Sequence, residues 1–368
     1  MLNSLRCQPD GRCWQGVLAV CNTTTIHHNA RARNWIAEDS KSLSELPFVS
    51  FSSLSGGAMA ELSVAAELAK YGPQARRSRR PSLAEAQAYC RHLARSHYEN
   101  FTVASWLLPR HLLPHFYSIY AYCRWADDLA DETASPAESL RLLDWWQEQL
   151  EQCYAGRPEH PVFVALLPTI EHFAIPSQPF ANLLIAFRQD QHVTRYSTPS
   201  ELLAYCQNSA NPVGRLVLYL GRSHDERRGL LADSICTGLQ WANFCQDVAR
   251  DWAKGRIYLP QESWDQAGYT EAMFARGEYN EAFRQTLRME VDRAEANLRG
   301  GESLVDLVPS ELRLEVALFT AGGLSILDSI RDADYNVLRR RPTLSRRQQF
   351  GLLWRCWRRT RRERGSIE

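Results

Sequence analysis

Two short acidic segments, residues 127–132 and 243–251, hold the side chains best suited to chemistry in this chain. In each segment, carboxylate or amide side chains recur every four residues. That spacing places them on one face of an α-helix, with about 5–6 Å between neighbouring Cβ atoms. The sequence therefore predicts two helices that each present a row of oxygen ligands. These ligands are Asp127, Asp131, Asn243, Asp247 and Asp251.

The direction of these rows follows from the residues that precede them. An acidic helix face is usually solvated. Here each row continues a stripe that is mostly apolar further upstream, because positions about 100° apart fall on one side of the helix. The first stripe is Phe116, Tyr120, Cys123, Asp127 and Asp131, and the second is Ala232, Cys236, Leu239, Gln240, Asn243, Asp247 and Asp251. Both helices are therefore predicted to aim carboxylates into the core.

Buried carboxylates are costly unless they are paired with a cation or bound to a metal. Hard oxygen ligands suit Mg²⁺, which takes octahedral oxygen coordination at about 2.0–2.1 Å and keeps water for substrate phosphates. Two facing sets could bind Mg²⁺ around a diphosphate and help it depart as a leaving group. A di-iron carboxylate bundle is the competing interpretation, but it needs Glu-x-x-His on two helices. The chain offers only the adjacent pair Glu171-His172.

The elements that must position these residues are helices. From Pro81 onward apolar residues recur at three- and four-residue steps, and prolines stand near many of the predicted starts. The predicted helices span 82–96, 114–132, 136–154, 161–173, 179–194, 199–220, 226–252, 280–299, 309–336 and 345–361. Pro212 should kink the helix over 199–220, because it removes a backbone hydrogen bond. The fold class is therefore all-α, with one helical domain over residues 81–340.

The two ends of the chain differ from this domain. Residues 1–80 are rich in polar residues and predict a mostly disordered extension. The C-terminal stretch 339–368 carries eleven arginines against two glutamates, and apolar residues are interleaved with them. These are Phe350, Leu352, Leu353, Trp354 and Trp357. The predicted basic amphipathic tail, residues 341–368, could lie on anionic lipid or could be simply solvated.

Composition narrows the class of protein. The 368 residues include 43 basic and 42 acidic side chains, a balance that argues against a nucleic-acid binder. The ten cysteines contain no C-x-x-C pair, which favours reduced thiols in the cytoplasm over a disulfide framework or a zinc site. No signal peptide and no apolar run of about 20 residues is present. We expect a cytoplasmic protein that touches a membrane peripherally, if at all.

Three segments in order resemble the squalene/phytoene synthase family of head-to-head isoprenoid synthases. Residues 117–131, YSIYAYCRWADDLAD, are similar to the first aspartate motif of the family with its upstream arginine. Residues 243–251, NFCQDVARD, resemble the second motif, and residues 255–260, GRIYLP, resemble the basic-aromatic segment that follows it. The resemblance covers about residues 84–340. It implies a single-domain isoprenoid-synthase-type helical bundle around a central cavity, which acts on a prenyl diphosphate.

The resemblance also implies roles for individual residues. Asp127, Asp131, Asn243, Asp247 and Asp251 would hold Mg²⁺, and the aspartates and Tyr205, the cavity tyrosine, would be catalytic. The diphosphate would meet Arg124, Arg256 and Tyr258. His97, Asn100, Arg215 and Gln240 complete the candidate substrate-binding set. Arg124 could instead pair with a neighbouring carboxylate, and Tyr205 could be a core tyrosine with a satisfied hydroxyl.

Departures from the family pattern point to one branch. The segments HYENF (97–101) and ANPVGR (210–215) resemble the branch of hopanoid biosynthesis that converts presqualene diphosphate and water to hydroxysqualene. Gln246 stands where relatives often carry arginine, which disfavours the handling of two diphosphates at once. Two alternatives stay open: condensation of two farnesyl diphosphates to presqualene diphosphate, squalene or phytoene, and a non-catalytic prenyl-lipid-binding assembly protein. Neighbouring hopanoid-pathway enzymes are possible partners.

In the predicted reaction, the cation left by the departing diphosphate rearranges in an apolar tunnel, where aromatic faces stabilise it. Candidates for the aromatic wall are Trp106, Trp125, Phe187, Tyr205, Trp241 and Phe244. Each of them could instead be an ordinary core residue, because large aromatic side chains fill protein cores in general.

Overall fold

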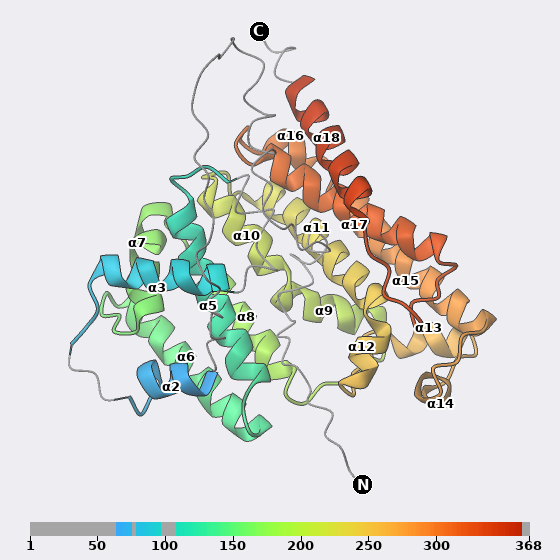
Figure 1. Ribbon diagram of the computed structural model, residues 1–368, viewed down its shortest axis with the longest axis horizontal. Helices are drawn as coiled ribbons and strands as arrows, with labels where there is room; N and C mark the ends of the chain where they lie inside the picture. The colour runs from blue at the N-terminus through green and yellow to red at the C-terminus, as the bar shows by residue number, and fades with distance from the viewer. Residues whose placement is uncertain (1–63, 76–78, 97–107, 363–368) are drawn as a thin grey trace, which may run out of the picture.

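The computed structural model describes residues 64–75, 79–96 and 108–362, and it is helical throughout these ranges except for loops and one isolated β-bridge. The helices, labelled as in Figure 1, are α2 (Val64–Tyr71), α3 (Leu83–Ser96), α5 (Leu113–Asp131), α6 (Pro136–Tyr154), α7 (Pro161–Phe173), α8 (Gln178–Gln189), α9 (Pro199–Ser209), α10 (Asn211–Leu220), α11 (Glu226–Gln246), α12 (Val248–Ala253), α13 (Gln261–Gln266), α14 (Glu271–Ala275), α15 (Glu281–Gly300), α16 (Leu304–Leu307), α17 (Arg313–Asp332) and α18 (Arg346–Arg362). The predicted all-α class is confirmed.

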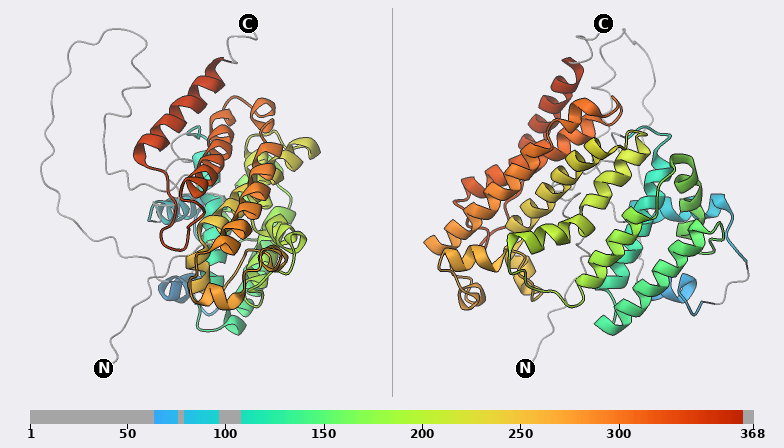
Figure 2. Two further views of the ribbon diagram at one scale, coloured as in Figure 1. Left: turned by 90° about the vertical axis from the view of Figure 1, so that its right-hand side faces the viewer. Right: turned by 180° about the vertical axis from the view of Figure 1, so that it is seen from behind.

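The bundle is organised around α5 and α11, the two helices that carry the acidic motifs. Helix α5 packs against α3, α6, α7 and α8, whereas α11 packs against α10, α15 and α17. Figure 2 shows these two groups from behind, with α9 and α10 between them. The two motif helices thus belong to two halves of one bundle and face its interior from opposite sides.

Proline interrupts one predicted helix more completely than a kink. The expected helix over 199–220 is two helices, α9 and α10, separated at Ala210 (φ −119°, ψ −48°). Pro212 lies in the first turn of α10, where its missing N–H costs nothing. Asn211 then fixes the new helix, because its side-chain oxygen accepts a 2.9 Å hydrogen bond from Thr237 of α11.

The predicted helix over 226–252 also breaks, at Asp247, which ends α11 and precedes α12. The sequence pattern did not indicate this break. Aspartate is a weak helix former, and the Asp247 carboxylate is held by an arginine far along the chain, as described below.

The two ends of the domain depart from the expected boundaries. Residues 64–71 form α2, inside the stretch 1–80 that is predicted to be mostly disordered but whose segment 60–71 has a helical pattern; residues 1–63 lie outside the described residues. At the other end, residues 346–362 form the predicted helix. It is docked on α17 through the buried side chains of Leu352 and Cys356.

Candidate active site

The first acidic motif forms a cluster at the C-terminal end of α5. Asp127 is only 2% exposed, as predicted from its stripe. The buried guanidinium of Arg124 faces Asp127 (3.7 Å), Asp128 and Glu132 (3.4 Å). One arginine therefore stands among three carboxylates.

This crowding shifts the pKa values of both Arg124 and Asp128. Burial opposes the charge on Arg124, but the carboxylates of Asp128 and Asp127 outweigh it and raise the arginine pKa. Burial raises the pKa of Asp128 well above its ordinary value; Arg124 opposes that rise and Asp127 adds to it. The cluster holds more carboxylates than one guanidinium can neutralise, which favours a further cation.

The second motif lies where α11 ends and α12 begins. Asn243 and Asp247 are 7% and 6% exposed, so they point inward as predicted. Asp247 accepts hydrogen bonds at 2.7 and 3.0 Å from Nε and Nη2 of Arg341, which lies in the loop between α17 and α18. Gln246 donates a hydrogen bond to the carbonyl of Pro342 and so anchors the same loop.

Arg341 is a site residue that the sequence analysis missed. It is one of many arginines in a basic stretch, and only its fork geometry on Asp247 separates it from the others.

The two motifs meet at their C-terminal ends. Asp131 lies 3.9 Å from Lys254 and 3.9 Å from Arg256, in the segment that follows Asp251. The Arg256 N–H donates to the Asp251 carbonyl at 2.9 Å, which ties that segment to the second motif. Asp131 and Asp251 therefore border one region, as the prediction of a shared site requires. Both lie nearer the surface than Asp127 and Asp247, and the Asp131 side chain is 21% exposed. The prediction that all four aspartates point into the core is therefore wrong for Asp131 and Asp251, which stand at the C-terminal ends of their motifs, where solvent reaches them.

The loop after α8 completes this region. An isolated β-bridge joins Arg195 to Ile257, and the Arg256 guanidinium donates to the Asp190 carbonyl at 3.1 Å. The buried carboxylate of Asp190 accepts a 3.1 Å hydrogen bond from the Tyr205 hydroxyl. Tyr205 is thus 1% exposed with a satisfied hydroxyl, which agrees with the structural alternative given for it, although it lies beside the site.

Aromatic rings pack behind the second motif. Tyr258 stacks on Phe244 with ring centroids 4.1 Å apart, and both rings lie near Tyr205. Two other aromatic candidates, Trp125 and Trp241, form contacts outside this group of rings. The Trp125 indole stacks on Trp146 and donates to Tyr89, and the Trp241 indole donates to Glu290. Trp125 and Trp241 therefore belong to the surrounding core, which is the alternative given for them, because hydrogen bonds hold them there and neither lines the cavity described below.

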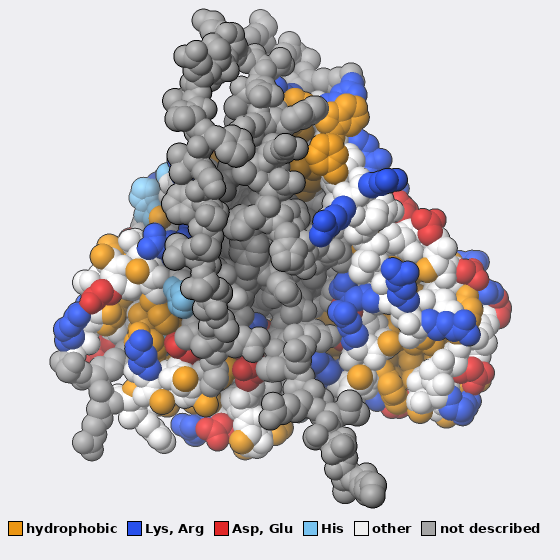
Figure 3. Space-filling model, viewed as in Figure 1, with side chains coloured by type: hydrophobic (Ala, Val, Ile, Leu, Met, Phe, Trp, Pro, Cys, Tyr) orange, Lys and Arg blue, Asp and Glu red, His pale blue; other side chains and the backbone are white. Residues whose placement is uncertain are grey.

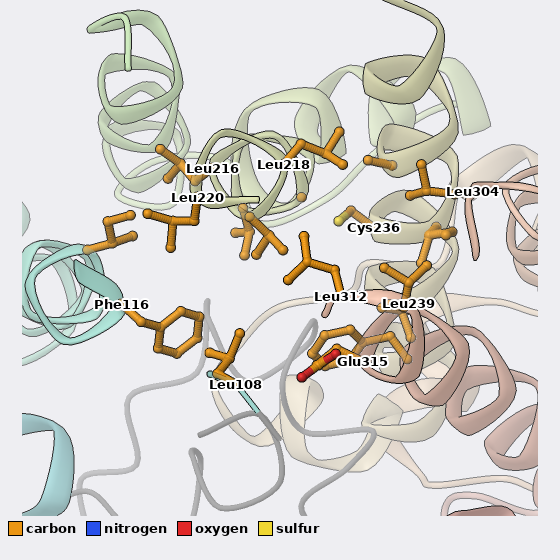
Figure 4. Close-up of a pocket in the computed structure, with 18 of the residues that line it drawn as sticks. Leu108, Phe116, Leu216, Leu218, Leu220, Cys236, Leu239, Leu304, Leu312 and Glu315 are labelled. Carbon is orange, nitrogen blue, oxygen red and sulfur yellow. The ribbon is translucent and has the colours of Figure 1, made fainter. Parts of the chain in front are cut away.

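An apolar cavity occupies the interior beyond the acidic clusters, between α5, α10, α11 and α17 (Figure 4). Its aromatic lining residues in the described chain are Phe116, Tyr120 and Phe319. The first two belong to the α5 stripe that ends in Asp127. The same helices that present carboxylates at one end therefore wall an apolar space further along.

The remaining predicted residues are placed as follows. Gln240 is 2% exposed on α11, and its Oε1 accepts no hydrogen bond from the described residues. Arg215 forms a 2.7 Å ion pair with Asp233, about 15 Å along α11 from Asn243 at 1.5 Å per residue, so the structure does not bring it to the acidic clusters. His97, Asn100 and Trp106 lie outside the described residues, and Phe187 is buried in α8.

The carboxylate and amide oxygens of the two motifs are the type of ligand that Mg²⁺ prefers. Asn243 Oδ1 is buried and accepts no hydrogen bond within the described ranges, so it is available to a cation. Among the described residues, no three His, Cys, Asp or Glu side chains converge as a ready-made metal site. The carboxylates are instead held by arginine and lysine, so the donor set would have to exchange these partners to bind metal.

Comparisons with known proteins identify the family and the fold. The family model described as squalene/phytoene synthase matches residues 94–348. The phytoene synthase of Arthrospira platensis is 30% identical over 265 residues, which cover 68% of this chain and 86% of that protein. The 15-cis-phytoene synthase of Synechococcus elongatus is 30% identical over 274 residues, 71% of this chain and 88% of that protein.

Two solved structures share the fold. The squalene synthase HpnC from Alicyclobacillus acidocaldarius is 44% identical, with a TM-score of 0.67, over 69% of this chain and 96% of that chain. A dehydrosqualene synthase in complex with ligand is 24% identical, with a TM-score of 0.68, over 76% of this chain and 98% of that chain.

An all-α bundle with two acidic motifs at one end of an apolar cavity defines an isoprenoid-synthase-type enzyme that uses prenyl diphosphates. The chain belongs to the squalene/phytoene synthase family.

Proposed function

We propose that this protein is a Mg²⁺-dependent enzyme of hopanoid biosynthesis that converts presqualene diphosphate and water to hydroxysqualene and diphosphate. The observation that carries the proposal is the junction of two acidic clusters, each held by cationic side chains, at one end of an apolar cavity. The 44% identity to a squalene synthase HpnC supports the hopanoid branch over the more distant phytoene synthases.

The chain's own cations would receive the leaving group. Arg124, Arg256 and Arg341 are bound to carboxylates or to a backbone carbonyl in this structure. Guanidinium groups bind diphosphate oxygens as well as carboxylates, so a bound substrate could take over these donors. Asp127, Asp131, Asn243, Asp247 and Asp251 would then hold Mg²⁺, which would neutralise the charge on the departing diphosphate.

The reaction balances without a reductant. The C–O bond of the cyclopropylcarbinyl diphosphate breaks, and the diphosphate keeps the electron pair. The cation rearranges, water adds to it, and the added water loses one proton to give the alcohol. The apolar cavity would hold the hydrocarbon chains and limit access of water to the cation.

The direct test is a product assay with separate substrates. The purified protein and Mg²⁺ are incubated with presqualene diphosphate or with farnesyl diphosphate alone. Hydroxysqualene and released diphosphate from the first substrate support the proposal. Turnover of farnesyl diphosphate alone would overturn it in favour of head-to-head condensation to presqualene diphosphate. Phytoene, which the names of two relatives suggest, needs two C20 units, so turnover of geranylgeranyl diphosphate alone would overturn the proposal in favour of that product. Binding of either substrate without release would indicate the non-catalytic alternative.

We further infer that α18 contacts an anionic membrane surface. Among the described residues, no helix combines the length and apolar character that spanning a bilayer requires. Helix α18 instead exposes Phe350 (65%) and Trp354 (44%), and arginines flank them (Figure 3). The guanidinium of Arg358 lies 4.6 Å from the Trp354 ring. Aromatic and basic side chains on one exposed helix suit a lipid interface, and a cytoplasmic enzyme with lipid substrates would benefit from it.

Vesicle sedimentation tests the membrane contact. The double variant Phe350→Ser, Trp354→Ser should bind phosphatidylglycerol vesicles more weakly than the parent protein. A matched control, Leu203→Ser with Leu230→Ser, removes exposed apolar side chains elsewhere. Equal binding by the two double variants would exclude α18 as the contact.

A further inference from the structure

Glu315 is out of place in the apolar cavity. It lies in the first turn of α17, its residue is only 4% exposed, and Figure 4 shows its carboxylate among the lining side chains. It is the single charged residue among the described residues that line the cavity. Neither carboxylate oxygen accepts a hydrogen bond from another described residue. A buried carboxylate without a partner is destabilising, so its presence needs a reason.

Ordinary structural roles do not supply that reason. Acidic residues often occupy the first turn of a helix because the helix dipole favours them there. An exposed side chain would serve that purpose, and Glu311, one turn earlier, is already exposed. The Glu315 side chain instead points into the space between α11 and α17. The same cavity is lined by Leu312, Val316 and Leu239, which are all apolar.

The position of Glu315 is at the far end of the cavity from the acidic clusters. The cavity lining on α11 runs from Ala232 to Leu239, and the second motif begins at Asn243. A Cβ atom at Gly323 of α17 would lie 2.9 Å from Leu239, and α17 runs in the same direction as α11, because both helices are antiparallel to α15. Glu315 lies eight residues before Gly323, so it is about 12 Å further from the second motif than Leu239 is, at 1.5 Å per residue. On α5, Phe116 lines the cavity and Asp127 lies eleven residues further along. A prenyl tail whose diphosphate is held by the motifs would therefore extend toward Glu315.

We propose that Glu315 is a specificity-determining residue that limits the length of the prenyl tail in this cavity. The proposal rests on the proposed function. A tail that stops short of Glu315 leaves its carboxyl group hydrated. A tail longer by one isoprene unit would displace that water and bury the carboxyl group against hydrocarbon with no hydrogen-bond partner. The site would thus select presqualene diphosphate, with C15-derived halves, over its C40 homologue, prephytoene diphosphate.

The test compares variants that differ at this carboxyl group. Glu315→Leu and Glu315→Met place apolar side chains of similar size there, and Glu315→Gln keeps a polar group. We expect the two apolar variants to raise the kcat/KM ratio of the C40 to the C30 substrate at least fivefold. Glu315→Gln and the exposed control Glu311→Leu should stay within twofold of the parent ratio.

A binding measurement tests the role of Glu315 independently of whether the protein catalyses the proposed reaction. Farnesyl and geranylgeranyl thiolodiphosphates are unreactive probes with tails of the two lengths, and calorimetry gives their affinities. The apolar variants should shift the affinity ratio toward the longer tail at least fivefold, whether or not the enzyme turns over presqualene diphosphate. An unchanged ratio in a folded Glu315→Leu or Glu315→Met protein would overturn the role of Glu315. Failure of the parent protein to convert presqualene diphosphate, with a shifted affinity ratio, would overturn only the proposed function.

Discussion

The two ends of the central cavity are built from the same helices and have opposite chemistry. On α5, Phe116 and Tyr120 line the apolar end, and Arg124 and Asp127 form the polar end two turns later. At the polar end, the buried carboxylates contact arginine side chains, although the cluster around Arg124 still holds more carboxylates than cations. At the apolar end, Glu315 has no such partner among the described residues.

This difference shows how one helix stripe can serve two parts of a substrate. A stripe keeps its direction along a helix while its residue types change, so one helix can hold a hydrocarbon tail and a charged leaving group in line. Charge at the polar end is paired and supports chemistry. The carboxyl group of Glu315 at the apolar end has no such partner among the described residues, which fits a role in excluding a longer prenyl tail.

The largest expected effect comes from removing a paired carboxylate at the polar end. Asp247→Asn should lower the rate of diphosphate release from presqualene diphosphate on the order of 10³-fold, because it removes a ligand charge and leaves Arg341 without its carboxylate partner. Initial rates across a Mg²⁺ titration provide the measurement. Asp328→Asn, an exposed aspartate on α17, is the matched control and should change the rate less than twofold. Equal losses of rate in Asp247→Asn and Asp328→Asn would show that Asp247 has no specific role in diphosphate release.

Replacing Arg341, which the sequence analysis did not identify as a site residue, should cause a smaller loss of activity. Arg341→Ala should lower kcat/KM about 10²-fold, because the two-pronged guanidinium contact is lost. Arg341→Lys should recover part of the activity, since it restores charge without the fork. Arg276→Ala, at an exposed ion pair with Glu278, is the control. Full activity in Arg341→Ala would mean that the Asp247 contact is only structural.

Glu315, at the apolar end, should make the stability of the protein depend on pH. Burial, with Glu311 adding to it, raises the pKa of Glu315 from 4.5 to about 7. The folded protein therefore binds more protons than the unfolded chain between these values, and its stability falls as the pH rises through 7. Relative to Glu315→Gln, the parent protein should lose about 2 kcal/mol of unfolding free energy between pH 5 and pH 8. Urea denaturation at both pH values measures it, and parallel pH profiles would contradict the buried carboxyl group.

The smallest effect tests the scaffold that both ends share. A Cβ atom at Gly238 of α11 would lie 2.8 Å from the Leu298 backbone nitrogen of α15. Gly238→Ala should therefore destabilise the protein by about 1 kcal/mol despite the better helix propensity of alanine. Gly351→Ala on α18, where nothing lies within 4 Å, should be neutral or stabilising. Thermal unfolding distinguishes them, and equal melting temperatures would show that α11 and α15 can separate without cost.

Local sequence patterns predicted much of this molecule. The inward direction of Asp127, Asn243 and Asp247 followed from helix periodicity alone, because the stripe that contains them is apolar upstream. A kink at Pro212 followed from the missing N–H of proline, but the complete separation of α9 from α10 at Ala210 did not. The helix break at Asp247 did not, because its carboxylate is held by a residue 94 positions away.

The sequence by itself therefore determined the helices, their buried faces and the two acidic motifs, since each depends on residues within a few turns of one another. Only the tertiary structure decided which of the many arginines meets Asp247 and which glutamate of α17 enters the cavity. Both outcomes depend on how α17 and the loop after it pack on α11, and such contacts between distant segments leave no periodic signal in the chain.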